Sequence, residues 1–406
     1  MKKPNPSEHQ VDLKESYEVP FLHHFVIPNR TWGFFPKDDI IHRLGRMVSV
    51  SRYDRFDFLN KYSKYNFKKY NTPLPQEDHR LVYEVLCFER AIELTQKHKK
   101  IAVLWSGGVD STTIICSLLM VGHNPKDLIV ICSENSKEEY PEFFYNLPKY
   151  GVTVSMYSKY ENVNEYITTV DCDIILSGFV NDQLYHQTMV HKYPEIAFDG
   201  WCDGLAKIYN IEEMSSYLEG DLTLFYQYSL HLGWDLENFF DWCVLFNFGT
   251  QYESVKNLIQ LKCTDEATRN KIDCFYDTQK FQNWAFTNRQ LVKEHWVKSE
   301  LEGNQHYKPE CKNIILQFTG DKDYYMNKGK RGSYPIPNEN HNPLYCQPVY
   351  CCAFDSFGVN QNLISTHYSD NLYLQYKFAK VFMDTYRKDE PLVPNLKLGI
   401  YYGYEN

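Results

Sequence analysis

The stretch IAVLWSGGVDSTTIICSLL, residues 101–119, constrains the fold of this chain more than any other. A short apolar run is followed by a glycine pair and then by a second apolar run that is long enough for a helix. Glycines at a strand-to-helix turn permit a tight bend and leave backbone N–H groups open to an anion. The stretch therefore predicts a buried strand, an anion-binding turn and a helix.

Three more short apolar runs follow at intervals that suit strands alternating with helices. We expect strands within 99–105 and at 127–133, 152–158 and 172–178, and helices at 76–98, from the turn to about 120, at 139–149 and at 161–169. Strands that alternate with helices form a parallel sheet with both faces covered. The expected fold class is α/β, a doubly wound parallel sheet, with ligands at the carboxyl ends of the strands.

The chain on either side of this α/β core differs in character. Residues 1–75 are interrupted by prolines and are predicted to be an irregular N-terminal region. Residues 201–406 lack strand alternation and are predicted to be mainly helical, with one last amphipathic helix at 370–388. We therefore divide the chain into 1–75, a core at 76–200 and a helical region at 201–406 that completes the domain.

The charge pattern bears on partners. A net charge of −9 over 406 residues argues against a general polyanion binder. Residues 41–70, however, hold eight Lys/Arg against two Asp, and their lysines alternate with Tyr and Phe. This basic block suits either phosphate neutralisation with base stacking or a solvated helix face. No apolar run has the roughly 18 residues of a membrane span, and the start lacks the apolar core of a signal peptide.

The turn SGGVDS at 106–111 combines an anion site with an acid. Gly107 and Gly108 leave backbone donors open, and Ser106 and Ser111 add hydroxyl donors. A carboxylate such as that of Asp110 would repel an anion in this turn unless a bound cation accompanied the anion. We therefore expect magnesium and pyrophosphate to bind here together, with Asp110 as a Mg²⁺ ligand.

SGG-x-D-S after a strand resembles the signature of the PP-loop ATP pyrophosphatases. This resemblance implies that ATP is cleaved between its α- and β-phosphates, that a substrate oxygen is adenylated and that pyrophosphate is released. The segment ILSGFVNDQLY, residues 175–185, resembles the SG-x-x-x-D-E-L segment of asparagine synthetases, β-lactam synthetases and lasso-peptide cyclases. It implies Asp182 as a second metal ligand and Gly178 as a point of close access to the nucleotide. Ser133, at the end of the next expected strand, completes the expected nucleotide contacts.

A third tract, residues 307–337, resembles the K-x-x-L-R … R-x-K-x-G-F-x-x-P region late in the same synthetases. The matching lysines are Lys308 and Lys330, and the resemblance implies that they stabilise charge on the adenylate and on the leaving phosphates. Three departures from the family pattern stand beside these matches. Lys2 stands where a glutaminase domain begins with cysteine, and Phe179 and Gln183 stand where the synthetases carry glutamate.

Two functional classes follow from these residues. The first is an ATP- and Mg²⁺-dependent ligase that adenylates a small-molecule or peptide carboxylate and transfers it to ammonia or an amine. The alternative is a nucleic-acid-modifying PP-loop enzyme that uses residues 41–70, and a nucleotide-binding protein without activity is a third interpretation. The twelve cysteines include no CxxC pair, which argues against thiolation but not against amination of a base. Scattered cysteines also suit a cytoplasmic protein. The sequence leaves the oligomeric state and the substrate open.

Overall fold

A computed structural model describes the chain over residues 75–158, 163–185, 196–208, 236–246 and 265–329, with shorter pieces elsewhere between 26 and 263. Lys330, most of the basic block at 41–70 and the expected helix at 370–388 lie outside the described residues. Within the block, β3 (Tyr53–Asp54) and β4 (Lys68–Lys69) pair as short parallel strands. A further pair, β1 (Val26–Ile27) and β2 (Val50–Ser51), is antiparallel.

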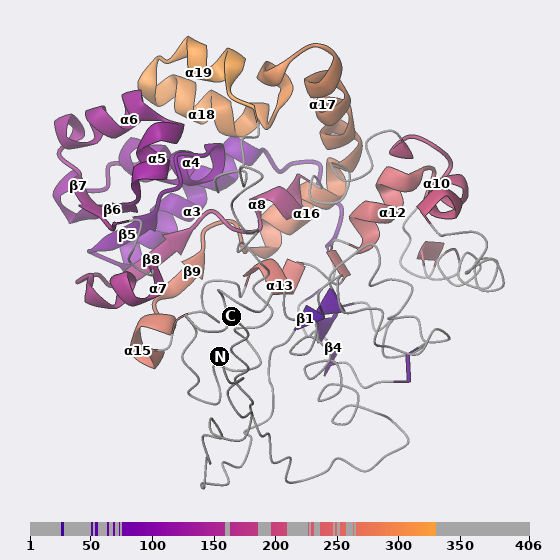
Figure 1. Ribbon diagram of the computed structural model, residues 1–406, viewed down its shortest axis with the longest axis horizontal. Helices are drawn as coiled ribbons and strands as arrows, with labels where there is room; N and C mark the ends of the chain where they lie inside the picture. Colours follow the sequence, from indigo (N-terminus) through magenta and orange to yellow (C-terminus); the bar gives the residue numbers. More distant parts are fainter. Residues whose placement is uncertain are drawn as a thin grey trace, which may run out of the picture.

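A five-stranded parallel sheet forms the centre of the fold, and it confirms the expected α/β class (Figure 1). Its spatial order is β7-β6-β5-β8-β9. The strands are β5 (Ile101–Leu104), β6 (Leu128–Cys132), β7 (Thr153–Met156), β8 (Ile174–Ser177) and β9 (Ile272–Cys274). The first four fall inside the expected ranges. For β5, β6 and β8 the reason is that a buried parallel strand needs a nearly continuous apolar segment, whereas β7 is the more exposed edge strand of the sheet.

The fifth strand, β9, corrects the expectation that residues 201 to about 320 contain only helices. It lies beside β8 in parallel register, with Ile272 opposite Ile175. Three residues are too few to show any periodicity in the sequence. The pairing with β8 supplies the backbone hydrogen bonds that make this segment a strand.

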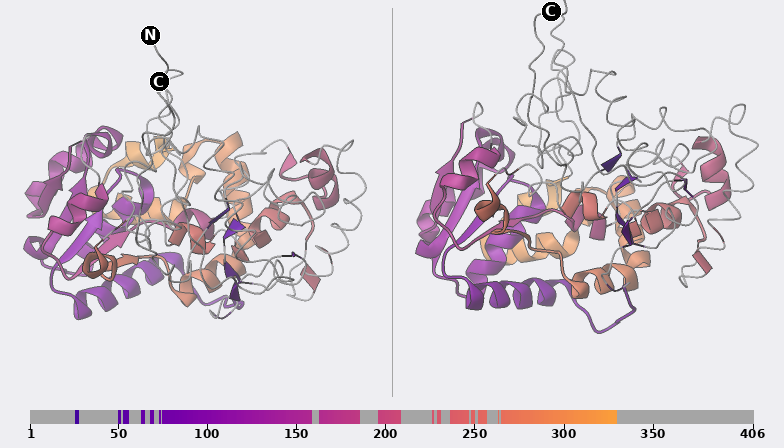
Figure 2. Two further views of the ribbon diagram at one scale, coloured as in Figure 1. Left: turned by 60° about the horizontal axis from the view of Figure 1, so that its bottom comes forward. Right: turned by 90° about the horizontal axis from the view of Figure 1, so that it is seen from below.

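Helices surround the sheet and extend beyond it (Figures 1 and 2). The expected helix at 76–98 begins later, as α3 (Tyr83–Lys97), and the helix after the turn is α4 (Val109–Met120). The expected helix at 139–149 is α6 (Pro141–Asn146) followed by a 3₁₀ helix at Leu147–Tyr150, and α5 (Glu134–Glu139) is a separate helix before it. The others are α7 (Val163–Tyr166), α8 (Asn181–Leu184), α10 (Trp201–Ile208), α12 (Phe239–Phe246), α13 (Tyr252–Lys256), α15 (Glu266–Arg269), α16 (Gln279–Thr287), α17 (Arg289–Leu301), α18 (Pro309–Thr319) and α19 (Lys322–Asn327).

Alternate residues of the strands enter two separate apolar clusters, one on each face of the sheet. Val103 and Val130 belong to the larger cluster, which includes α3, α4 and α18. Ala102 and Ile131 belong to the smaller one, which includes Ile167. Both faces are therefore buried, as expected for a doubly wound sheet. Among the described residues no helix is both long and apolar enough to cross a bilayer.

The strand order changes direction at β5, which has β6 on one side and β8 on the other. The carboxyl ends of β5 and β8 therefore flank a topological switch point, where open α/β sheets form a crevice for ligands. The turn at 106–111 follows β5, and residues 178–185 follow β8. The fold thus brings the two sequence motifs to one place at the sheet edge.

Candidate active site

The turn after β5 has the conformation that its glycines suggested. Gly107 has a φ of +77°, in the left-handed region, and a Cβ added there would lie 2.4 Å from the carbonyl oxygen of Ser136 and 2.6 Å from Cβ of Glu139. Only glycine fits without moving α5, whose residues press on the turn. Gly108 is the N-cap of α4 and offers no side-chain cap, so the first N–H groups of that helix receive no acceptor from it. This helix start is suited to an anion.

The two serines of the turn lie side by side. Ser106 Oγ and Ser111 Oγ are 3.1 Å apart, and the backbone N–H of Ser106 donates to Ser111 Oγ over the same distance. The N–H of Gly108 donates to Ser106 Oγ at 3.3 Å. The hydroxyls therefore hold the turn closed and lie next to the helix start, where they can donate to an incoming anion.

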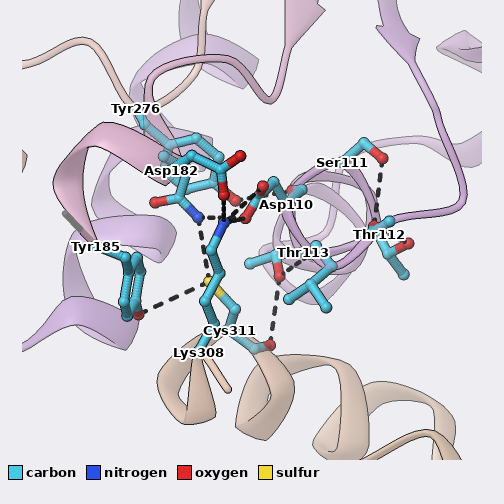
Figure 3. A network of polar contacts seen from close by, with 12 residues as sticks. Asp110, Ser111, Thr112, Thr113, Asp182, Tyr185, Tyr276, Lys308 and Cys311 are labelled. Atoms are coloured by element: carbon cyan, nitrogen blue, oxygen red, sulfur yellow. Dashed lines mark hydrogen bonds and ion pairs between the residues drawn. The ribbon is translucent and has the colours of Figure 1, made fainter. Parts of the chain in front are cut away.

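Lys308 joins the two predicted acidic residues (Figure 3). Its Nζ donates to both carboxylate oxygens of Asp110, at 2.6 and 2.8 Å, and to Oδ1 of Asp182 at 2.7 Å. The lysine side chain is 0% exposed, whereas Asp110 is 24% and Asp182 33% exposed. The structure thus brings together three of the residues selected from sequence, and the carboxylates face solvent more than the ammonium does.

The pKa values follow from this arrangement. Burial disfavours the charged form of Lys308, but the attraction of Asp110 and Asp182 outweighs it and raises the pKa of Lys308 well above its usual range. Burial raises the pKa of Asp110; Lys308 opposes that shift and Asp182 adds to it. The ammonium is therefore charged at neutral pH, and it compensates the carboxylates that surround it.

Asn181 and Tyr83 support the carboxylate of Asp110 through hydrogen bonds, and neither was among the site residues expected from the sequence. Asn181 Nδ2 donates to Asp110 Oδ1 at 2.6 Å, and its Oδ1 accepts from the hydroxyl of Tyr83 at 2.6 Å. The Tyr276 hydroxyl donates to the backbone carbonyl oxygen of Asp110 at 2.8 Å. All three partners are buried. Asn181 directly precedes Asp182 in the second motif, which is the one signal that could have drawn attention to it.

Backbone strain is concentrated at this site. Val180 and Lys308, with φ values of 66° and 47°, are the non-glycine residues with positive φ among those that the structure describes. Such a conformation is uncommon, and for a β-branched valine it is a true outlier. Val180 is the N-cap of α8, which carries Asp182, and Lys308 is the N-cap of α18. Strain of this kind persists where surrounding structure enforces it, and it is enriched at functional sites.

Gly178 lies where the end of β8 meets α4. A Cβ at this position would lie 3.1 Å from Cβ of Asp110 and 3.1 Å from the backbone nitrogen of Ser111. The absence of a side chain thus allows close approach of the two motifs to each other. This contact is within the chain itself, and the expected access to a nucleotide stays a prediction.

Ser133 lies at the end of β6, but its hydroxyl is engaged in a helix cap. Ser133 Oγ accepts from the N–H of Ser136, and Ser136 Oγ accepts from the N–H of Ser133, which forms a capping box at the start of α5. Phe179 is partly buried and packs on the larger apolar cluster, and Gln183 is buried. Ser133 therefore has a capping role and Phe179 a packing role, and the expected contact of Ser133 with a nucleotide stays a prediction.

A second buried lysine near the turn was not selected from sequence. Lys328 forms an ion pair with Glu139, the last residue of α5, and the two side chains are 7% and 12% exposed. Because Glu139 lies against Gly107, this ion pair borders the glycine turn at 106–111. Lys328 is two residues before the predicted Lys330, which lies outside the described part of the chain.

The donor set at Asp110 and Asp182 fits a hard divalent cation. Carboxylate oxygens are preferred Mg²⁺ ligands, and Mg²⁺ in nucleotide sites is commonly held by one or two carboxylates together with water and substrate phosphates. Elsewhere in the described part of the chain, no group of three or more His, Cys, Asp or Glu side chains could hold a metal. The two aspartates would therefore hold Mg²⁺ with ligands that the protein does not supply.

No protein-family model and no curated protein matches the chain. The fold and the site define the class of protein, an α/β protein with a glycine turn and a carboxylate pair at the topological switch point of a parallel sheet. The functional assignment depends on these residues.

Proposed function

We propose that this protein is an ATP-dependent ligase that adenylates a carboxylate, releases pyrophosphate and transfers the acyl group to ammonia or an amine. The observation that carries the proposal is the contact of Lys308 with Asp110 and Asp182 beside the glycine turn. A turn for phosphate, two acids for a metal and one buried cation are the parts that adenylation needs.

The bound ATP is held mainly through its phosphates. The N–H groups at the start of α4 and the hydroxyls of Ser106 and Ser111 donate to the β- and γ-phosphates, which become pyrophosphate. Asp110 and Asp182 would hold Mg²⁺, which supplies charge neutralisation for pyrophosphate as it leaves. Asn181 fixes the orientation of Asp110, so the carboxylate needs little rearrangement during the reaction.

In the first chemical step an oxygen of the substrate carboxylate attacks the α-phosphorus of ATP. The bond from that phosphorus to the oxygen that bridges to the β-phosphate breaks, and pyrophosphate leaves with the bond electrons. Lys308 lies among the carboxylates, where an ammonium can stabilise the negative charge that develops on the phosphates. In the second step the amine nitrogen bonds to the acyl carbon and loses a proton, and AMP leaves with the carboxylate-derived oxygen.

The cytoplasm is the compartment that we propose for this reaction. The nine cysteines in the described part of the chain are all free thiols, and most of them are buried. Disulfides are rare in reducing compartments, where thiols of this kind persist.

A screen for pyrophosphate release tests the proposal. ATP, Mg²⁺ and ammonia are supplied together with carboxylate metabolites, peptides or RNA as acceptors, and pyrophosphate, phosphate and AMP are quantified separately. We expect AMP and pyrophosphate in equal amounts with a carboxylate, and loss of both in Asp110→Asn. Asp171→Asn, which alters an exposed acid that pairs with Lys100, is the matched control and should be fully active. ADP and phosphate as products would contradict the proposal, and RNA as the acceptor that promotes the reaction would favour base modification instead.

A further inference from the structure

The ammonium of Lys308 has no donor left for another partner once its three hydrogen bonds to carboxylates are counted. A lysine ammonium carries three N–H donors, and the three acceptors are the two oxygens of Asp110 and Oδ1 of Asp182. The ammonium therefore occupies the point where the two carboxylates converge (Figure 3). A metal that both aspartates bind would need the same point and the same oxygens.

A free divalent cation is a poor competitor for this point. Two carboxylates and one ammonium leave one net negative charge, and adding a dication would reverse its sign. The side chain of Lys308 is 0% exposed, so its displaced ammonium would lose both aspartates without reaching water. A buried charge without a partner is strongly unfavourable. No third His, Cys, Asp or Glu ligand joins these acids in the part of the chain that the structure describes. The free ion would gain few ligands for this cost.

A metal–triphosphate complex removes both obstacles. Its phosphate oxygens supply the remaining metal ligands, and they also accept hydrogen bonds from the displaced ammonium. Nearby rings can support the ammonium as it moves: Lys308 Nζ lies 5.5 Å from the ring centre of Tyr185 and 5.7 Å from that of Tyr307. The backbone of Lys308 is held in a left-handed conformation at the start of α18, so the movement falls to the side-chain torsions.

We propose that Lys308 is a built-in counter-ion that occupies the metal position between Asp110 and Asp182, so that the site binds a metal–triphosphate complex and excludes the free metal ion. This inference rests on the proposed function, and it adds an order to binding: metal and nucleotide enter together. Lys308 exchanges its carboxylate partners for phosphate oxygens as they enter.

The wild-type protein gives the first test, with Mn²⁺ as the probe and electron paramagnetic resonance as the readout. We expect binding of free Mn²⁺ to be at least about tenfold weaker than binding of Mn²⁺ in the presence of α,β-methylene-ATP, once the affinity of the ion for the nucleotide alone is subtracted. Equal affinity with and without the nucleotide overturns the inference. Failure of the nucleotide to bind even with Mn²⁺ present contradicts the proposed function instead.

The second test removes the ammonium. Lys308→Met should bind free Mn²⁺ at least about tenfold more tightly than the wild type, because the two carboxylates lose their counter-ion. Lys312→Met is the matched control: this lysine lies one turn further along α18 and donates to the carbonyl oxygens of Asn304 and Tyr325. It should leave Mn²⁺ binding unchanged. A folded Lys308→Met protein that binds Mn²⁺ no more tightly than the wild type overturns the inference. If Lys308→Met does not fold, the same measurement is made on Lys308→Gln, with the same expected result.

Discussion

The side-chain amide of Asn181 lies between Tyr83 and Asp110, and it makes a hydrogen bond of 2.6 Å to each. The Tyr83 hydroxyl donates to the amide oxygen, which leaves the amide nitrogen to face the carboxylate. The orientation of Asn181 is therefore fixed by Tyr83, and the position of Asp110 depends in turn on Asn181. If Asp110 binds a metal as proposed, Asn181 and Tyr83 orient a ligand, and mutation of such residues typically costs about 10- to 100-fold in metal affinity or activity.

Tyr83→Phe should weaken this support without adding volume or charge. We expect metal-dependent pyrophosphate release to fall by about 10- to 100-fold, as for other residues that orient metal ligands. The unfolding free energy should fall by about 1–3 kcal/mol, because the amide oxygen of Asn181 loses a buried donor. The measurements are steady-state kinetics at varied Mg²⁺ and urea unfolding. Tyr226→Phe, at a half-exposed tyrosine, is the control, and an equal loss of activity in both variants would contradict the positioning role.

The close contact of Gly107 with α5 leads to a second prediction. Gly107→Ala and Gly122→Ala both place alanine at a positive φ, of +77° and +86°, but a Cβ at Gly122 meets nothing within 4 Å. The shared backbone cost is about 1–2 kcal/mol. Gly107→Ala should lose more stability than this and should also lose binding of a fluorescent ATP analogue, since Ser136 and Glu139 must move away. Equal stability and equal nucleotide binding in the two variants would show that the turn is not tightly enclosed.

Much of the fold could be predicted from the sequence because the information is local. The strands β5, β6 and β8 are short apolar runs, and the turn after β5 is marked by a glycine pair within six consecutive residues. The rest depends on distant pairing. β9 is three residues long and is a strand because β8 lies beside it. A pattern of that length carries no period to detect.

In the site, too, the residues within short motifs could be predicted from the sequence, whereas contacts between distant segments could not. Asp110 and Asp182 lie in recognisable motifs, and Lys308 was selected with them on the basis of a third tract. The contact between Lys308 and Asp110 spans 198 positions in the sequence, and the contact of Tyr83 with Asn181 spans 98. Tyr83 and Tyr276 belong to no motif, and Lys328 lies within the third tract but was not among its matching lysines. The packing of α3, β9 and α19 around the switch point brings these residues to the site.

The buried amine of Lys312 predicts a dependence of stability on pH. Burial, together with the nearby charge of Lys328, lowers the pKa of Lys312 to about 7 in the folded protein. Between about pH 7 and the ordinary lysine pKa near 10.4 the unfolded chain binds more protons at this residue, so its contribution to stability rises with pH. The slope is at most about 1.4 kcal/mol per pH unit.

Lys312→Met should abolish this contribution. Urea unfolding of the variant and the wild type at several values between pH 7 and 10 should show that the wild type gains stability relative to the variant as pH rises. Other titrating groups are present in both proteins and cancel in the difference. A difference that stays constant over this range would mean that Lys312 is charged in the folded state.

The ion pair of Lys328 with Glu139 leads to the last prediction. Lys328→Met leaves a nearly buried carboxylate unpaired beside the glycine turn, and breaking a buried pair in this way costs about 3–5 kcal/mol of stability. The unpaired charge should also repel phosphate, so affinity for Mg-ATP should fall. The double variant Lys328→Met with Glu139→Gln removes both charges and should recover most of the lost stability and part of the affinity. Calorimetry and unfolding on the four proteins of this cycle provide the measurements. If the double variant loses as much affinity as Lys328→Met alone, then Lys328 itself contacts the nucleotide, and repulsion by Glu139 is not the cause.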